Sequence, residues 1–406
     1  MKRRVVITGI GVVTCVGTSK DTFWDAIIKG KSGIKKISFF DPTPFRSQIA
    51  GEIKEFDPLQ FIDIKEVRDM DRVSHLTIAA TEEAIKDAGF KPDENAGIII
   101  GTGIGGITSD DFQHTLHDLK GPRYVQPMAI PTIMYNAIAC HVSRRYGLMG
   151  SGYTVATACT SGANAIGEAY RLIKHGYTDV MVAGGAEATI SPGIWSGWCA
   201  MRVLSTKNDD PAGACRPFSK DRSGMVISEG AGIVILEELE HALKRSSNIY
   251  AEMIGYGSSY DARHITAPNV YGQMRAISIA MKDANISPDK VDYIKAHGTS
   301  TVLNDKIETE TIKKMFGDKA YSIPVSSIKS MIGHTIGASG AIELIACCLS
   351  LRDSIIPPTI NYTERDPDCD LDYVPNKARK ARLNVIMTNS FGFGGINGVL
   401  ILRRCE

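Results

Sequence analysis

The sequence contains no apolar run of the about 20 residues that a membrane-spanning helix requires. The chain of 406 residues has a formal net charge of +1, so no excess of charge favours nucleic acid or a membrane surface as a partner. Proline is sparse outside residues 41–44 and 357–358, which argues against a flexible linker between domains. We therefore expect no membrane span and no nucleic-acid partner.

Cysteine pairs that bind zinc or form disulfide frameworks are also missing. The nine cysteines are scattered, none forms a CxxC pair, and none stands with histidines at zinc-finger spacing. We expect no metal site and mostly buried thiols. The basic start MKRRVVITGIG runs directly into a strand-like segment and leaves no room for a signal peptide. A cytoplasmic protein, or a mature organelle form, is the default expectation.

Short apolar runs alternate with longer helical patterns along the chain. The apolar and charged fractions, 43% and 22%, are those of a globular protein. Runs such as VVITG, GIII, YTVAT, VMVAG and GIVIL indicate buried strands. The segments that indicate helices are residues 21–29, 72–88, 161–175, 271–284, 305–316 and 339–351. This alternation predicts an α/β fold with helices on both faces of the sheets.

A weak internal repeat suggests two related halves. VVITGIG near the start is echoed by AEMIGYG at 251–257, and GAGIVILEE is echoed by GGINGVLILRR near the end. The polar segment HALKRSSN separates the two sets. We predict halves at residues 1–248 and 249–406, the first carrying the candidate nucleophile described below.

Residues 101–106, GTGIGG, match the dinucleotide-binding pattern GxGxxG. A dinucleotide site also needs a second strand that ends in an acidic residue about 20 residues further on. Here the polar stretch DDFQHTLHDLKGPR follows instead. An oxidoreductase is therefore the weakest interpretation, and we predict that these glycines serve close packing at a strand–loop turn.

A candidate nucleophile follows one of the strand-like runs. Residues 152–175 read as a strand, a turn that contains Cys159, and a helix rich in small residues. A helix N-terminus offers N–H groups and partial positive charge, which lower a cysteine pKa and favour the thiolate. A buried structural cysteine at a helix start explains the local sequence equally well.

Two histidines and a glycine-rich loop supply possible partners. His297 in AHGTST and His334 in KSMIGH both lie beside glycine near a strand end, and Lys329 precedes the second. Histidine N–H groups suit the enolate that forms in a decarboxylative carbon–carbon condensation. The loop NSFGFGGING, residues 389–398, can offer backbone N–H groups to an oxyanion. A lone histidine is more often structural, and the loop alone also fits an ordinary turn.

In this order and spacing, TACTSG, AHGTST, KSMIGH and NSFGFGG resemble the motifs of the β-ketoacyl-acyl-carrier-protein synthases, the elongating condensing enzymes of type I/II. The resemblance extends from VVITGIG to the C-terminus. It implies a thiolase-like five-layered αβαβα fold and a homodimer. It also implies an acyltransferase of fatty acid elongation that condenses acyl-ACP with malonyl-ACP. The phosphopantetheine arm belongs to the partner acyl carrier protein, so no cofactor of the chain's own is expected.

The resemblance also assigns individual roles. Cys159 would carry the acyl group, and the N–H groups of Cys159 and Phe391 would bind the oxyanion, with Phe391 also gating the cysteine. His297 and His334 would stabilise the enolate. The remaining implied residues are Lys329 and Glu343 as organisers, Thr299 and Thr301 for the pantetheine arm, Ile104 and Trp198 for the acyl chain, and Lys65, Arg68, Arg123 and Arg202 for carrier docking.

Several positions depart from the family's pattern. Ile332 and Ile396 replace threonines, and Trp198 replaces a phenylalanine. Asp69 and Tyr124 stand where basic docking residues are common. The segments CRPFS, HITAP and DPDCDLD resemble the nodulation protein E branch of the family, which makes unusual acyl chains. Together these departures predict a specialised acyl preference.

Related classes of protein fit less well. A degradative thiolase needs a second cysteine in the glycine-rich loop, where this chain has none. The synthase III and chalcone branch uses His and Asn, and His334 argues against it. A non-elongating partner subunit lacks the nucleophilic cysteine. A housekeeping elongating synthase and a dedicated ketosynthase of a specialised lipid or polyketide pathway both remain open.

Overall fold

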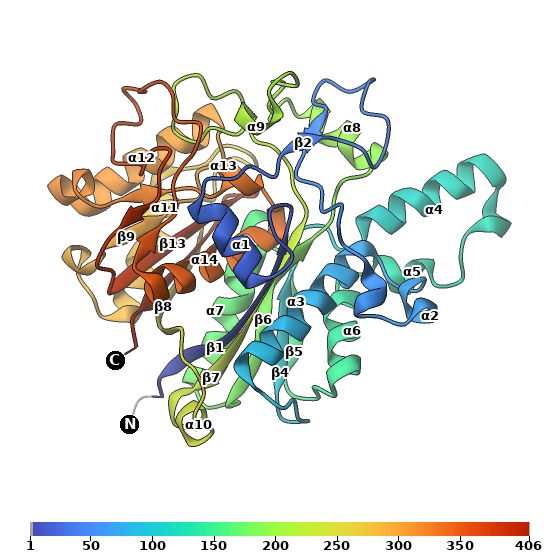
Figure 1. Ribbon diagram of the computed structural model, residues 1–406, viewed down its shortest axis with the longest axis horizontal. Coiled ribbons are helices and arrows are strands. Elements are labelled where there is room, and N and C mark those ends of the chain that lie inside the picture. Colours follow the sequence, from blue (N-terminus) through green and yellow to red (C-terminus); the bar gives the residue numbers. More distant parts are fainter. Residues whose placement is uncertain (1–2, 406) are drawn as a thin grey trace.

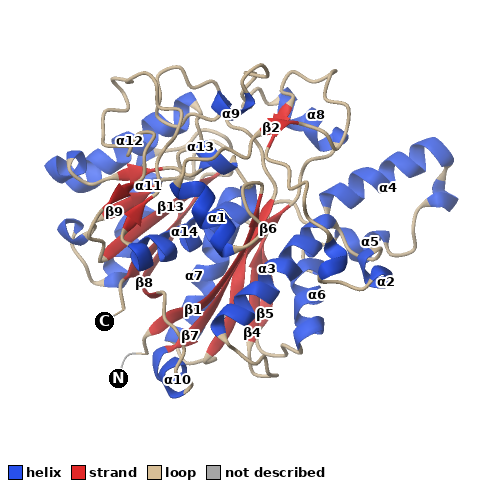
Figure 2. Cartoon of the chain, in the orientation of Figure 1, coloured by secondary structure: helices blue, strands red, loops and turns tan. Residues whose placement is uncertain are grey.

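The computed structural model describes residues 3–405, which build a ten-stranded mixed sheet in two halves (Figures 1 and 2). The first half contains, in spatial order, β5 (Gly152–Val155), β4 (Gly97–Gly101), β6 (Val180–Glu187), β7 (Gly230–Glu238) and β1 (Val5–Thr14). The second half contains β8 (Ala251–Tyr260), β14 (Ile396–Arg403), β13 (Val385–Gly392), β9 (Tyr293–Lys295) and β10 (Val325–Ser326).

The two halves repeat one pattern of strand pairing. In each half the two outer pairs are parallel and the two inner pairs are antiparallel. β1 and β8 join the halves, because residues 5–7 pair antiparallel with residues 251–253. The predicted related halves are therefore present. The predicted boundary after residue 248 lies in the loop between α10 (Leu239–Lys244) and β8.

Helices form three further layers around and between the sheet halves (Figure 2). The central layer consists of α7 (Ser161–Lys174) and α14 (Ser339–Asp353), which contact strands of both halves. The outer layers consist of α3 (Arg72–Ala88) and α6 (Ala137–Tyr146) on the first half, and α11 (Val270–Ala284) and α12 (Val302–Phe316) on the second. This arrangement is the predicted five-layered αβαβα order.

Small residues let the two central helices approach closely. A Cβ atom on Gly340 would lie 2.6 Å from the Ala163 Cβ, and one on Gly162 would lie 2.9 Å from the Gly337 carbonyl oxygen. α14 is buried on all sides from residue 339 to residue 351, which explains why apolar residues occupy every face of it apart from Glu343 and two serines. The N-terminal ends of α7 and α14 therefore meet in the middle of the molecule, where the candidate site lies.

The other elements pack around these layers or project from them. The helices are α1 (Lys20–Ile28), α2 (Ile64–Val67), α4 (Ile107–Lys120), α5 (Ala129–Ile133), α8 (Pro192–Ala200), α9 (Pro211–Ala214) and α13 (Lys329–Ile332). Two small sheets pair β2 (Lys35–Lys36) with β3 (Ile49–Ala50), and β11 (Ile355–Ile356) with β12 (Arg379–Lys380). α4 stands out from the body at the right of Figure 1. Within residues 3–405, no helix combines the length and hydropathy needed to cross a bilayer.

Candidate active site

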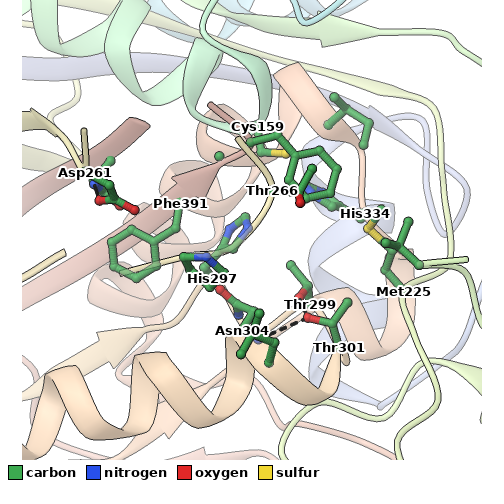
Figure 3. A pocket seen from close by; sticks show the side chains of 17 residues that line it. Cys159, Met225, Asp261, Thr266, His297, Thr299, Thr301, Asn304, His334 and Phe391 are labelled. Atoms are coloured by element: carbon green, nitrogen blue, oxygen red, sulfur yellow. Dashed lines mark hydrogen bonds between the residues drawn. The ribbon is translucent and has the colours of Figure 1, made fainter. Parts of the chain in front are cut away.

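Cys159, His297, His334 and Phe391 line one cavity of about 240 Å³. Figure 3 shows these side chains around a common space, with Thr299 and Thr301 on the same wall as each other. Apolar side chains complete much of the lining, namely Val203, Met225, Leu303, Ile336 and Phe393. The motifs that lie far apart in the sequence thus converge on one cavity.

The turn that carries Cys159 is held in a fixed shape. The 3₁₀ turn η3 (Ala158–Thr160) connects β5 to α7, as predicted, and Ala158 has a positive φ of 52°. The Ser161 hydroxyl accepts the Thr157 N–H at 2.9 Å, and the Asn164 amide donates to the Thr157 hydroxyl at 3.0 Å. These bonds stabilise a backbone conformation that non-glycine residues adopt rarely. The Cys159 side chain is thereby directed to the cavity.

The expected lowering of the Cys159 pKa was wrong. Burial raises the pKa of this thiol to about 11, and it outweighs the opposing effects of the Phe393 N–H hydrogen bond and the Lys329 charge. Cys159 is 6% exposed, and removing a thiolate from water is the larger effect. The resting nucleophile is therefore a thiol at neutral pH, which loses its proton when it attacks.

His297 is oriented by the ammonium group of Lys329. Lys329 Nζ lies 3.4 Å from His297 Nδ1 and donates to the His297 carbonyl oxygen at 2.8 Å. An ammonium group can only donate, so Nδ1 acts as acceptor and the ring proton is assigned to Nε2. This tautomer gives His297 an N–H donor on the ring edge opposite Lys329.

His334 lies beside His297 as a second neutral imidazole. The two ring centroids are 5.3 Å apart at 84°, and His334 Nδ1 lies 2.9 Å from the Ser339 hydroxyl. Burial lowers the pKa of both histidines well below 6.5, and the Lys329 charge lowers it further. Both rings are therefore uncharged at neutral pH, each with one N–H to donate.

Lys329 belongs to a buried charge cluster that includes a lysine missed by the sequence analysis. Lys329 Nζ lies 2.5 Å from Glu343 Oε1, and both side chains are at most 1% exposed. Lys295 Nζ lies 3.4 Å from the same oxygen and is also fully buried. Burial lowers the pKa of Lys295. Two lysines around one carboxylate favour negative charge in the adjacent cavity.

A second buried carboxylate, also missed, holds the loop of His297. Glu308 on α12 accepts the backbone N–H groups of His297 and Gly298, both at 2.8 Å. Burial raises the pKa of Glu308 to about 7. The sequence did contain a signal for this buried carboxylate. Glu308 stands three residues after Asp305 on one helix, so the two side chains share a face, and both are buried.

The glycine-rich loop brings a different phenylalanine to the nucleophile. The backbone N–H that donates to the Cys159 sulfur belongs to Phe393, whereas Phe391 presents its ring, 6.0 Å from the His297 ring. Gly394 and Gly395 have positive φ angles of 85° and 69°, which explains the glycines of this turn. The sequence motif alone did not distinguish which of the two phenylalanines approaches Cys159.

Asp261, which the sequence analysis also missed, connects the glycine-rich loop to the segment after β8 by hydrogen bonds. The Asp261 backbone N–H donates to the Gly395 carbonyl at 2.7 Å, and the Asn397 amide donates to the Asp261 carboxylate at 2.7 Å. Asp261 and Asn397 both line the cavity. The segment after β8 therefore fixes the loop that carries Phe393.

The predicted substrate-binding residues fall into two groups. Thr299 and Thr301 line the cavity with their hydroxyl oxygens 2.9 Å apart. Ile104 and Trp198 are not part of the cavity lining, but they pack in the apolar cluster that contains Cys159. Ile332 and Ile396, which stand where the family pattern has threonines, are buried side chains outside the lining.

The four predicted docking residues are all exposed. Lys65 lies on α2 and Arg68 follows it, Arg123 lies after α4, and Arg202 follows α8. α2, α4 and α8 lie on the same side of the molecule, at the right of Figure 1. The basic residues thus share a side of the molecule, and docking itself stays a prediction.

Comparison with known proteins identifies the family. The family models described as "Beta-ketoacyl synthase, N-terminal domain" and "Beta-ketoacyl synthase, C-terminal domain" match residues 2–242 and 250–363. This chain belongs to the beta-ketoacyl synthase family. A relative from Synechocystis sp., a 3-oxoacyl-[acyl-carrier-protein] synthase 2, is 46% identical over 100% of this chain and 99% of its own length.

Solved structures of ketosynthases share the fold. The ishigamide ketosynthase/chain length factor matches with a TM-score of 0.95 at 36% identity, covering 100% of both chains. AntDE:AntF, a type II PKS acyl-carrier protein in complex with its ketosynthase, matches with a TM-score of 0.93 at 35% identity, again over 100% of both chains. The predicted thiolase-like fold of this beta-ketoacyl synthase is thereby confirmed.

Proposed function

We propose that this chain is a 3-oxoacyl-[acyl-carrier-protein] synthase that elongates acyl chains with malonyl units. The observation that carries the proposal is the shared cavity, in which a cysteine at a helix start faces two neutral histidines beside a buried lysine cluster. The Synechocystis relative with this name supports the same reaction.

The first step is acyl transfer to Cys159. The cysteine sulfur attacks the thioester carbonyl of the acyl carrier, the bond to the pantetheine sulfur breaks, and the thiol proton leaves with that sulfur. The backbone N–H groups of Cys159 and Phe393 are placed to bind the oxyanion of this step. We assign the second donor to Phe393 rather than to Phe391, because the Phe393 N–H already contacts the sulfur.

The second step is decarboxylation of the malonyl group. Loss of CO₂ leaves its electron pair on the adjacent carbon, and the resulting enolate oxygen takes hydrogen bonds from the His297 and His334 N–H groups. Neutral histidines suit this step because they donate without protonating the enolate outright. Lys329 fixes the His297 tautomer, and Glu343 holds Lys329.

The third step forms the carbon–carbon bond. The enolate carbon attacks the Cys159 thioester, and collapse of the oxyanion releases the 3-oxoacyl carrier and a cysteine thiolate, which takes a proton from solvent. Thr299 and Thr301 would bind the pantetheine arm beside the histidines. The chain supplies every group that these steps need, so we propose no cofactor beyond the arm on the carrier.

An acyl carrier protein and a second copy of the chain are the proposed partners. Lys65, Arg68, Arg123 and Arg202 offer positive charge for an acidic carrier. The edge strand β5 ends the sheet with its Tyr153 side chain exposed. Further exposed apolar residues between residues 107 and 150 are Phe112, Leu119, Met128, Ile130, Met134, Tyr135 and Met149. Pairing of two β5 edges would cover such a surface in a homodimer.

We further propose a cytoplasmic location. A nucleophilic thiol has to stay reduced, and the cytosol maintains free thiols.

A specialised acyl preference is supported by one observation. The buried indole N–H of Trp198, which packs in the apolar cluster of Cys159, has no hydrogen-bond partner within the described part of the chain. An acyl chain with an oxygen atom at that depth would satisfy this donor, whereas a saturated chain would leave it unpaired. Faster acylation by an oxygen-bearing acyl carrier than by its saturated analogue would favour a dedicated ketosynthase.

Condensation by a Cys159→Ala variant tests the proposed function. The wild-type enzyme should convert acyl carrier and malonyl carrier to 3-oxoacyl carrier, and the variant should form none, because the covalent route is lost. Cys369→Ala, which alters another buried cysteine, should retain activity. Product formation by Cys159→Ala at the rate of Cys369→Ala would overturn the proposal.

A further inference from the structure

The GTGIGG segment that resembles a nucleotide-binding loop binds a carboxylate of this chain. Glu187, at the end of β6, is fully buried. It accepts the backbone N–H groups of Gly103 at 2.6 Å and Ile104 at 3.2 Å. Its carboxylate also accepts the Thr102 hydroxyl at 3.2 Å and the Gly337 N–H at 2.9 Å. The donors that such a loop would offer to a phosphate are therefore directed at Glu187.

The glycines of this contact are needed for steric reasons. A Cβ atom on Gly103 would lie 2.7 Å from Glu187 Oε2, and one on Gly337 would lie 2.6 Å from the same oxygen. A Cβ atom on Gly101 would lie 2.2 Å from the Ser161 backbone carbon. The predicted close packing at this turn is present, and it brings the loop within reach of both Glu187 and α7.

Glu187 connects two loops from different halves of the chain. Residues 102–105 follow β4 in the first half, and residues 335–337 follow His334 in the second. The first loop carries Ile104 and the second carries Ile336, and both side chains pack in the apolar cluster of Cys159. Ile336 also lines the cavity. One carboxylate thus sets the spacing between two apolar walls beside the nucleophile.

We propose that Glu187 is a positioning residue that sets acyl-chain preference by holding Ile104 and Ile336 at a fixed spacing beside Cys159. This inference rests on the proposed function, since it concerns the acyl group that Cys159 accepts. Glu187 does not line the cavity; besides its contacts to the two loops, its charge raises the pKa of the Cys159 thiol, an effect that is the same for every acyl group. Decarboxylation of malonyl carrier, which needs the histidines and no acyl chain, is therefore independent of it.

The Glu187→Gln substitution keeps the size of the side chain and removes half of its acceptors. The new amide NH₂ group faces N–H donors in place of a carboxylate oxygen, so at least one loop contact is lost. Long acyl chains have to lie against the walls that these loops carry, whereas an acetyl group does not extend that far. We expect acylation by hexadecanoyl carrier to fall about tenfold more than acylation by acetyl carrier.

Single-turnover acylation of the full-length enzyme tests the inference. Intact-protein mass follows acylation by acetyl, octanoyl and hexadecanoyl carriers, and CO₂ release follows decarboxylation of malonyl carrier. Glu83→Gln is the matched control, because Glu83 on α3 also accepts two backbone N–H groups, from Val12 at 2.9 Å and Lys20 at 2.7 Å. Thr102→Val, which removes the hydroxyl that donates to Glu187, is the milder variant. It should lower the chain-length ratio, defined as the rate of acylation by hexadecanoyl carrier divided by the rate with acetyl carrier, by about threefold.

The outcomes separate the two proposals. A chain-length ratio that changes in Glu187→Gln and Thr102→Val, with decarboxylation retained, supports the inference. A ratio equal to that of Glu83→Gln, or an equal loss of acylation for all chains together with decarboxylation, overturns it and leaves a structural role only. Failure of the wild-type enzyme to accept any acyl group overturns the proposed function, and this inference with it.

Discussion

Replacing Lys329 by methionine removes a buried ammonium group while keeping a side chain of similar length. In the structure this group contacts Glu343 Oε1 at 2.5 Å. Without it, Lys295 at 3.4 Å is the one cation that the carboxylate retains among residues 3–405, where Glu343 Oε2 has no hydrogen-bond partner. Breaking a buried ion pair from one side typically costs about 3–5 kcal/mol. Since Lys295 offsets part of that loss, we expect the free energy of unfolding to fall by about 3 kcal/mol.

The same substitution should also slow decarboxylation in the folded protein. His297 loses the donor that fixes its tautomer, so its Nε2 proton is no longer held in place. Loss of a whole hydrogen-bond donor to an oxyanion lowers the reaction rate about a hundredfold, so a mispositioned His297 N–H should lower the decarboxylation rate about tenfold or more. Urea unfolding gives the stability change, and CO₂ release from malonyl carrier gives the rate.

An exposed ion pair supplies the control for Lys329→Met. Lys306 lies 2.9 Å from Asp368 with both side chains about half exposed, so Lys306→Met should leave stability and decarboxylation unchanged. The reasoning would be refuted if Lys329→Met matched Lys306→Met in both measurements, because the cluster would then neither stabilise the fold nor orient His297.

The remaining predictions concern pH, packing and assembly. Burial lowers the pKa of His297 and His334 well below 6.5, so the decarboxylation rate should stay level as pH falls through 6.5, and a rate that halves there would contradict the assignment. The unfolded histidines protonate below 6.5, which lowers the free energy of unfolding under that pH, whereas Glu308 and Glu187, whose pKa values burial raises to about 7, oppose this change by binding protons in the folded state. Gly340→Val places a Cβ within 2.6 Å of the Ala163 Cβ and should destabilise the fold by about 1–3 kcal/mol or more in urea unfolding; unchanged stability would show that α7 and α14 are not tightly packed. Tyr153→Lys should convert the proposed dimer to monomer in light scattering, and an unaffected dimer would place the interface elsewhere.

The strongly patterned elements were predictable from the sequence. The helix predicted at 72–88 coincides with α3, and those predicted at 161–175 and 271–284 differ from α7 and α11 by one residue. These segments combine clear apolar periodicity with end signals such as Gly89 and Asn285 in left-handed conformations. The apolar faces of α4 are less regular, and it projects from the body, so no helix was predicted there.

The site was predictable where a motif marks it and not where burial decides the chemistry. Cys159, His297 and His334 each stand in a short motif beside glycine, and the fold brings them to one cavity. Lys295 ends β9, and a lysine in a strand predicts an exposed face, yet β9 lies between two parallel strands in a sheet whose faces are covered, and Lys295 is fully buried. The Cys159 pKa was predicted in the wrong direction because local sequence reports the helix start but not the degree of desolvation.

The contacts of Glu187 could not be predicted from sequence patterns. Its partners Gly103 and Gly337 lie 84 and 150 residues away in sequence, and only the folded chain shows which acceptor the glycine-rich loop serves. Phe393 is a second example. The motif contains two phenylalanines, and only the folded chain shows that the backbone N–H of Phe393 reaches the Cys159 sulfur.

The most direct test of the central claim is intact-protein mass after incubation with an acyl carrier and then with malonyl carrier. The account predicts a mass gain of one acyl group, mapped to Cys159, which malonyl carrier discharges as 3-oxoacyl product. An acyl group mapped to another residue, or one on Cys159 that malonyl carrier does not discharge, would contradict it.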